Sequence, residues 1–169
     1  WQEWHAATQG ELKIPAYLGS CWGVYGIHLA GDMRSWEEWQ GPKKFTVGPP
    51  IYLDRPVYQY HYESLRWFDL WLKGNDTGLM DEPPVHLFLD GGEGEWIEAN
   101  EWPLSQTRWT PFYLHEHGLL SEHEFWANES STVYIDSPYE RGSAVFHTPA
   151  MVEATDVCGP MALTLYGST

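Results

Sequence analysis

A compact group of histidines and glutamates is the first part of this 169-residue chain that could do chemistry: His115-Glu-His117, followed by His123 and Glu124. Imidazole and carboxylate groups bind zinc, and two histidines at positions i and i+2 of a strand lie on one face. The segment, however, runs into a turn at Gly118. We therefore interpret the group as a solvated polar loop, with zinc binding as the lesser alternative.

The other polar groups have simple structural interpretations. The acidic run Asp90–Glu95 lacks the spacing of an EF-hand and is interpreted as a solvated turn. Cys21 and Cys158 are too few for a disulfide or metal framework, so we interpret them as buried or half-buried thiols. No metal or organic cofactor is expected.

The chain contains no recognisable hydrolytic nucleophile. In α/β-hydrolases the serine occupies a Gly-x-Ser-x-Gly turn that follows a strand. Here Gly19-Ser20-Cys21 lacks the second glycine. We therefore interpret Ser20 as a loop residue.

Composition excludes two classes of partner. With 24 acidic and 9 basic side chains the net charge is −15, which would repel nucleic acid. No run approaches the roughly 18 apolar residues of a membrane-spanning helix, so no membrane partner is expected. The chain opens at Trp1 without the basic region of a signal peptide, which suggests truncation. We expect a soluble protein, and leave open whether it is cytoplasmic or secreted.

Strands and helices alternate in the first half. Apolar residues predict short buried strands over Lys13–Gly19 and Lys44–Val47. A helix is predicted over Asp32–Trp39, with Asp32 as its N-cap, and a longer one over Tyr60–Lys73. This alternation is typical of a parallel α/β sheet covered by helices.

The longer helix has an amphipathic pattern. Leu65, Phe68 and Leu72, with Trp71 on the shoulder, form its predicted apolar stripe. Trp67 and Trp71 could shape an acyl or substrate pocket. Packing of this face against the sheet and the following domain is the favoured interpretation.

The pattern changes to short strands near residue 82. Turn residues separate strands predicted over Val85–Leu89, Trp109–Leu114, Thr132–Ile135, Gly142–His147 and Met161–Tyr166. Short strands at such spacing are typical of an antiparallel sandwich or barrel. We expect α/β followed by all-β structure, with domains 1–82 and 83–169.

Several segments together resemble one known family. Glu63–Leu89 has the residue order of a helix, turn and strand at the end of a catalytic domain. Asn100–Leu104 with Thr110–Leu114 is similar to "E-W-P-L … T-x-x-Y-L", and Phe146–Ala150 with Glu153–Leu163 to "F-x-T-x-P … E-x-x-x-x-x-G-P". Their order resembles the X-Pro dipeptidyl-peptidase/cocaine esterase-like α/β-hydrolases over roughly residues 12–169.

The resemblance implies a fragment of a larger enzyme. Residues 1–82 would be the C-terminal part of the α/β-hydrolase domain, and residues 83–169 the first part of a jelly roll with Leu163 and Leu165 on an inner strand. An incomplete sandwich leaves unpaired edges, so the isolated chain should be marginally stable or should associate as a homo-oligomer. The parent would be a serine hydrolase acting on a small-molecule ester or a peptide, with its serine upstream and the fragment inactive alone.

The acid of the triad usually follows the strand that Ile14–Leu18 resembles, in a Gly-Trp-Tyr-Asp-like sequence. Here Gly23 and Val24 occupy that place. Asp32 is the nearest carboxylate, and a role as helix N-cap explains it equally well.

The histidine of the triad usually lies in a Gly-Pro-Trp-x-His-like loop, where this chain has Tyr52. Tyrosine, with an ordinary pKa of about 10, cannot shuttle protons near neutral pH. His61 and His28 are the nearest replacements, although hydrogen-bonded packing is the commoner role for such a histidine.

These departures leave two interpretations open. Either the acid and base have moved to nearby positions, or the triad chemistry has been lost. In the second case the chain is a non-catalytic, acidic β-sandwich interaction module with an inherited fold. The sequence does not determine whether the substrate is an ester or a peptide, the acyl group, or the oligomeric state.

Overall fold

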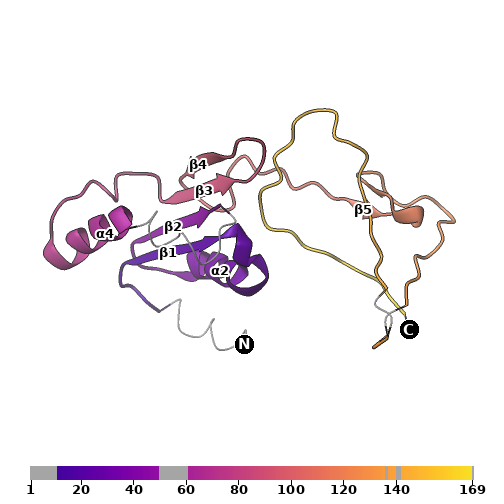
Figure 1. Ribbon diagram of the computed structural model, residues 1–169, viewed down its shortest axis with the longest axis horizontal. Helices are drawn as coiled ribbons and strands as arrows, with labels where there is room; N and C mark the ends of the chain where they lie inside the picture. Colours follow the sequence, from indigo (N-terminus) through magenta and orange to yellow (C-terminus); the bar gives the residue numbers. More distant parts are fainter. Residues whose placement is uncertain (1–10, 50–60, 136, 140–141, 169) are drawn as a thin grey trace. The chain divides into compact units, whose positions relative to one another are not determined.

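The computed structural model describes residues 11–49, 61–135, 137–139 and 142–168 (Figure 1). Contacts divide the chain into two compact units. The first unit comprises Trp1–Ser105 with Cys158–Thr169, and the second comprises Gln106–Val157.

A four-stranded sheet forms the centre of the first unit (Figure 1). Its strands are β1 (Ala16–Cys21), β2 (Lys43–Gly48), β3 (Val85–Leu89) and β4 (Glu95–Ala99), in the spatial order β1-β2-β3-β4. β1, β2 and β3 are parallel, and β4 pairs antiparallel to β3. The sheet thus continues across residue 82, where the domain boundary was predicted, and that boundary stays a prediction.

Helical segments connect the parallel strands. After β1 come a 3-10 turn, η1 (Trp22–Val24), a π-helical turn, η2 (Tyr25–Leu29), and α2 (Ala30–Glu38). α4 (His61–Lys73) lies between β2 and β3. Both predicted helices are confirmed, but the N-cap prediction for Asp32 is wrong: Leu29 is the N-cap and Asp32 lies in the first turn. The turns before α2 are already helical, so α2 begins two residues earlier than expected.

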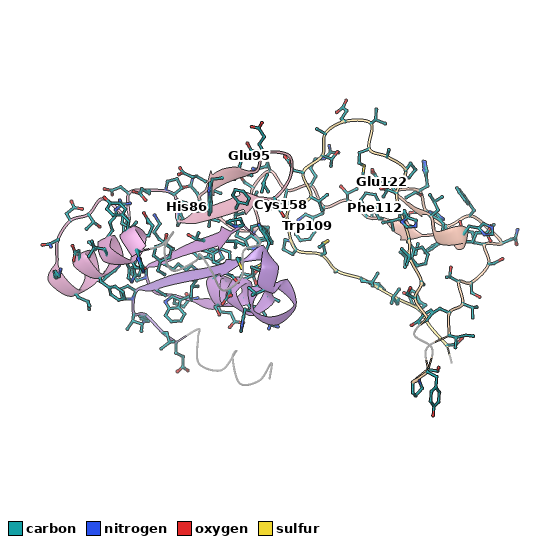
Figure 2. All side chains as sticks on the ribbon, in the orientation of Figure 1. His86, Glu95, Trp109, Phe112, Glu122 and Cys158 are labelled. Carbon is teal, nitrogen blue, oxygen red and sulfur yellow. The ribbon has the colours of Figure 1, made fainter. Side chains whose placement is uncertain are left out.

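The hydrophobic core lies on one face of the sheet. Phe45, Val47, Val85 and Leu87 of β2 and β3 are 0% exposed. Trp36 of α2 stacks on Phe45 with ring centroids 5.8 Å apart. The core also contains Leu29, Trp102 and Leu104, and Cys158 packs against it (Figure 2). The two thiols are free, with Cys21 buried and Cys158 half-buried, as predicted.

The predicted apolar stripe of α4 does not face the sheet. Leu65 is 55% exposed, Phe68 54% and Leu72 77%. The helix instead buries Trp67, whose ring lies 5.4 Å from that of Tyr17 on β1, so the packing of this tryptophan on the sheet is confirmed. The stripe is exposed because polar side chains, described below, occupy the side of α4 nearest the sheet.

The second unit contains little regular structure. β5 (Tyr113–Leu114) pairs antiparallel with β6 (Leu120–Ser121), and η3 (Glu116–Gly118) joins them. The strand predicted over residues 109–114 is thus confirmed only at its end. The predictions for 132–135 and 142–147 are wrong, apart from one bridge from Leu119 to His147.

The strand predicted over residues 161–166, in the first unit, is also wrong. Leu163 and Leu165, expected on an inner strand, are 71% and 65% exposed. A strand requires a neighbour to bond its backbone groups, and no such neighbour is found within the described part of the chain. Across the same described ranges, no helix is long and apolar enough to cross a bilayer.

Candidate functional site

A cavity of about 570 Å³ lies in the first unit, between the carboxyl-terminal half of β1, the turns that follow it, and α4. In open α/β sheets, ligands bind outside the carboxyl ends of parallel strands. The cavity therefore occupies the part of the sheet where a site is expected. Its lining residues are Tyr17, Gly19, Ser20, Cys21, Val24, His28, Asp32, Thr46, Ser64, Trp67 and Phe68.

Asp32 and His28 both line this cavity. They lie one helical turn apart, on α2 and η2, so their side chains share a face. Burial raises the pKa of the half-buried Asp32 carboxyl, and the Ser20 hydroxyl and the charge of His28 act in the opposite direction. A carboxyl whose pKa is perturbed by burial in a cavity is a frequent feature of functional sites.

The position that holds the acid in the resembled family also lies at the cavity. Val24, in η1, is 6% exposed and lines the cavity, while Gly23 beside it is exposed. Val24 cannot orient an imidazole. Asp32 presents its carboxyl to the same cavity from the next helix, so a displaced acid is geometrically possible.

His61 is not among the residues that line the cavity. It is exposed and is the first residue of α4. Tyr52, at the place of the family histidine, lies outside the described residues. Of the two histidines predicted from sequence, the structure therefore brings only His28 to the cavity.

Ser20 lies in β1, not in a loop, so its predicted place is wrong. The strand continues to Cys21 because both residues pair with β2, Ser20 opposite Val47 and Cys21 opposite Gly48. Its Oγ is buried, and it lies at the cavity near the Asp32 carboxyl whose pKa it lowers. Sequence alone could not reveal that this hydroxyl is buried beside the cavity.

The hydroxyl groups of Tyr17 and Thr46 belong to residues that also line the cavity. Tyr17 Oη lies 3.2 Å from Thr46 Oγ1, and it donates to Glu63 Oε2 of α4 at 3.4 Å. Sequence reasoning missed both residues, because they come from different strands. They give an otherwise aromatic wall two groups that can bind polar atoms of a ligand.

His115, in the second unit, is not part of a solvated loop as predicted, since it is 1% exposed. Its Nδ1 lies 2.6 Å from Glu129 Oε1, and its Nε2 lies 3.0 Å from both the His123 carbonyl oxygen and Ser121 Oγ. His117 adopts a positive φ of 61° and is exposed, so the two histidines do not share a face. Across the described residues, no group of three or more potential ligands could hold a metal ion.

We predict that Asp32→Asn changes how stability depends on pH. Because the pKa of Asp32 is raised in the folded state, its stabilising contribution is full below its ordinary pKa of 3.8 and is lost as pH rises through the raised value. Asparagine does not ionise. Thermal melts from about pH 3 to pH 7 should show the variant gaining stability over wild type as pH rises. An equal difference at both ends would contradict this.

Comparisons with known proteins identify a family to which this chain is similar. The profile of the X-Pro dipeptidyl-peptidase C-terminal non-catalytic domain matches residues 77–169. The chain is 42% identical over 105 residues to cocaine esterase from Rhodococcus sp. (strain MB1 Bresler), covering 54% of this chain and 18% of that protein. It is 40% identical over 69 residues to a protein of Mycobacterium tuberculosis (strain CDC 1551 / Oshkosh) named for serine esterase activity, covering 41% of this chain and 11% of that protein.

A solved structure has the same fold. A CocE/NonD family hydrolase from Staphylococcus aureus matches with a TM-score of 0.65 at 21% identity, over 71% of this chain and 22% of that chain. The chain thus spans between about a tenth and a quarter of the length of these relatives.

Proposed function

We propose that this chain, which belongs to the X-Pro dipeptidyl-peptidase C-terminal domain family, is part of a serine hydrolase that cleaves ester or amide acyl bonds. Its relatives are named as esterases and CocE/NonD hydrolases, which supports this proposal. Residues 1–82 would be the end of the α/β catalytic domain. Residues 83–169 would begin a jelly roll that forms a wall of the larger protein. The nucleophilic serine would lie on a preceding segment, so these residues alone would be inactive.

The observation that carries the proposal is the cavity shared by Asp32 and His28. In the proposed mechanism the upstream serine attacks the acyl carbon, and its proton passes to the imidazole of His28. That proton then leaves with the alcohol or amine, and a water molecule releases the acyl group by the same route. Asp32 would orient His28 and stabilise the imidazolium. His61 is the alternative base.

The two histidines can be distinguished by mutation in the longer polypeptide. His28→Ala should lower kcat/KM for a p-nitrophenyl ester by about ten-thousandfold or more, since removing a triad member removes proton transfer. His117→Ala, on an exposed side chain of the second unit, is the matched control and should have no effect. A large loss in His61→Ala with activity retained in His28→Ala would transfer the role of base to His61.

Labelling with a fluorophosphonate tests the hydrolase itself. The native polypeptide, captured with an antibody to this segment, would be treated with the probe and its intact mass recorded. A chain several hundred residues longer that gains one probe supports the proposal and places the nucleophile outside these residues. A long chain that stays unlabelled contradicts it.

The second candidate is a non-catalytic, acidic interaction module. It is favoured by the glycine and valine at the family's acid position, Gly23 and Val24, and by a family description that names a non-catalytic domain. An unlabelled chain near 19.5 kDa would support it. For both candidates we propose a soluble protein, cytoplasmic or secreted, that self-associates. For the hydrolase, the proposed substrate is a small-molecule ester or a peptide.

A further inference from the structure

The contact between α4 and the sheet is mostly polar. Trp67 is the single residue of α4 that is buried, and the apolar residues Leu65, Phe68 and Leu72 are exposed. Glu63 lies one turn before Trp67 and one turn before Arg66, so its carboxylate neighbours both side chains, and it bonds Arg66 on α4 and Tyr17 on β1. Trp67 is therefore the main apolar anchor of α4, and the other contacts described between this helix and the sheet are polar.

A buried lysine lies on the same side of the sheet. Lys44 of β2 is 1% exposed, although it carries a charge. Its ammonium group donates to the Leu79 carbonyl oxygen at 2.9 Å and lies 3.2 Å from Glu82 Oε2. Taking a lysine charge out of water is strongly unfavourable without a paired anion, so the Glu82 carboxylate is required there.

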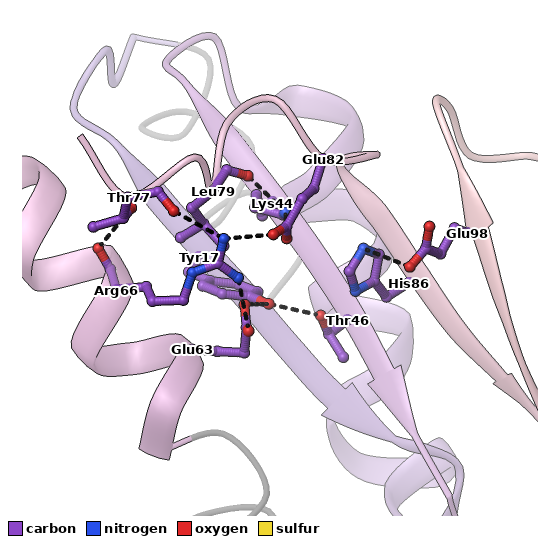
Figure 3. Close-up of polar contacts among 10 residues, drawn as sticks. All are labelled: Tyr17, Lys44, Thr46, Glu63, Arg66, Thr77, Leu79, Glu82, His86 and Glu98. Carbon is purple, nitrogen blue, oxygen red and sulfur yellow. Dashed lines mark hydrogen bonds and ion pairs between the residues drawn. The ribbon is translucent and has the colours of Figure 1, made fainter.

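Glu82 divides its two oxygens between the sheet and the helix (Figure 3). Oε2 faces Lys44, and Oε1 accepts from Arg66 Nη2 at 2.5 Å. Arg66 also donates to Glu63 Oε1 at 3.2 Å and to the Thr77 carbonyl oxygen at 3.0 Å. The hydrogen bond from Arg66 holds the pKa of the Glu82 carboxyl below its usual range, and Lys44 adds to this effect.

The helix held in this way supplies a wall of the cavity. Trp67 and Phe68, which follow Arg66 directly, line the cavity together with Ser64. Glu63 continues the network to Tyr17 Oη, which also lines it. The position of α4 therefore sets both the width of the cavity and the direction of a hydroxyl group at its wall.

We propose that Glu82 is a positioning residue, which fixes the α4 wall of the cavity by binding Lys44 of β2 and Arg66 of α4 at the same time. It touches no ligand itself. Its effect on a bound molecule passes through Trp67, Phe68 and Tyr17.

Hydrogen exchange of the full chain tests the proposal without any assumption about activity. Glu82→Gln keeps the shape of the side chain and removes its charge, and should speed the exchange of amides in residues 61–73 by roughly tenfold or more. Glu98→Gln is the matched control, since Glu98 is 61% exposed and lies 4.0 Å from His86 Nε2. Unchanged exchange of α4 in Glu82→Gln would overturn the proposal.

A second variant separates positioning from general stability. Glu82→Gln alone leaves the buried Lys44 without its anion, so the amides of the sheet should also exchange faster. In Glu82→Gln combined with Lys44→Met no buried lysine is left unpaired. The amides of the sheet should then return to the wild-type exchange rate, while those of α4 still exchange fast. If α4 also returns to wild-type exchange, the link to Arg66 is not what holds the helix, and the proposal fails.

Kinetics in the longer polypeptide test whether Glu82 shapes the cavity. This experiment rests on the proposed function. Glu82→Gln should raise KM for a p-nitrophenyl ester several-fold with kcat within about twofold, as expected when uniform binding is lost. Faster exchange of α4 with unchanged KM would overturn the claim that Glu82 shapes the cavity. A wild-type protein without turnover would count against the hydrolase alone, and the exchange of α4 would still decide the role of Glu82.

Discussion

Replacing Phe45 by alanine is expected to lower the free energy of unfolding of the first unit by about 3–5 kcal/mol. The side chain is 0% exposed and stacks on Trp36, which joins β2 to α2. Truncation removes the transfer free energy of the ring and leaves a cavity that the flanking core residues Val47 and Val85 cannot fill. Urea denaturation followed by tryptophan fluorescence measures the change.

Phe68→Ala is the matched control for this prediction. It removes the same group from α4, where the ring is 54% exposed. Its effect should stay below about 1 kcal/mol, as for other surface substitutions. Equal losses in the two variants would show that burial in this core does not determine stability.

Replacing Glu129 by alanine is expected to destabilise the second unit by about 1–3 kcal/mol, the range for a buried group left without its partner. His115 would keep its bonds at Nε2, and its Nδ1 would lose the carboxylate at 2.6 Å. The imidazole is enclosed by Trp126, stacked at 4.9 Å, and by Phe125, so water cannot easily replace the carboxylate. Hydrogen exchange of residues 113–130 measures the local loss.

Glu124→Ala supplies the comparison, because Glu124 is an exposed carboxylate of the same segment. It should leave the exchange of residues 113–130 unchanged. If both variants accelerate exchange equally, the loss arises from general charge effects and the contact with His115 contributes nothing specific.

Local patterns predicted β1, β2, β3, α2 and α4 of the first unit and missed β4. β3 has the predicted bounds, because Pro83 and Pro84 mark its start and Asp90 its end. α4 covers His61–Lys73 and ends at the residue before Gly74, as predicted, while the predicted start at Tyr60 lies outside the described residues. The patterns failed where long-range pairing decides the outcome: residues 132–135 and 161–166 are β-prone, yet lack a neighbouring strand within the described residues.

The candidate site was only partly predictable. Asp32 and His28 are four residues apart, so a helix brings them together without any long-range information. The bond between His115 and Glu129 joins residues fourteen positions apart across an irregular loop, and Lys44 and Glu82 are thirty-eight apart. No periodicity relates such positions. Lys44 inside the predicted buried strand Lys44–Val47 is the available signal, and it does not identify its partner.

The spatial order of the strands repeats their order along the chain. During folding, each of these four strands can therefore pair at an edge of the growing sheet. None has to be inserted between two strands that are already paired. The β3–β4 hairpin, closed by the short turn from Leu89 to Glu95, needs only local contacts and belongs to a class of structures that form within about 1–10 μs. The parallel pairs must first close longer loops. Assembly of the sheet can thus begin at its carboxyl-terminal hairpin and proceed toward β1, opposite to the direction of synthesis.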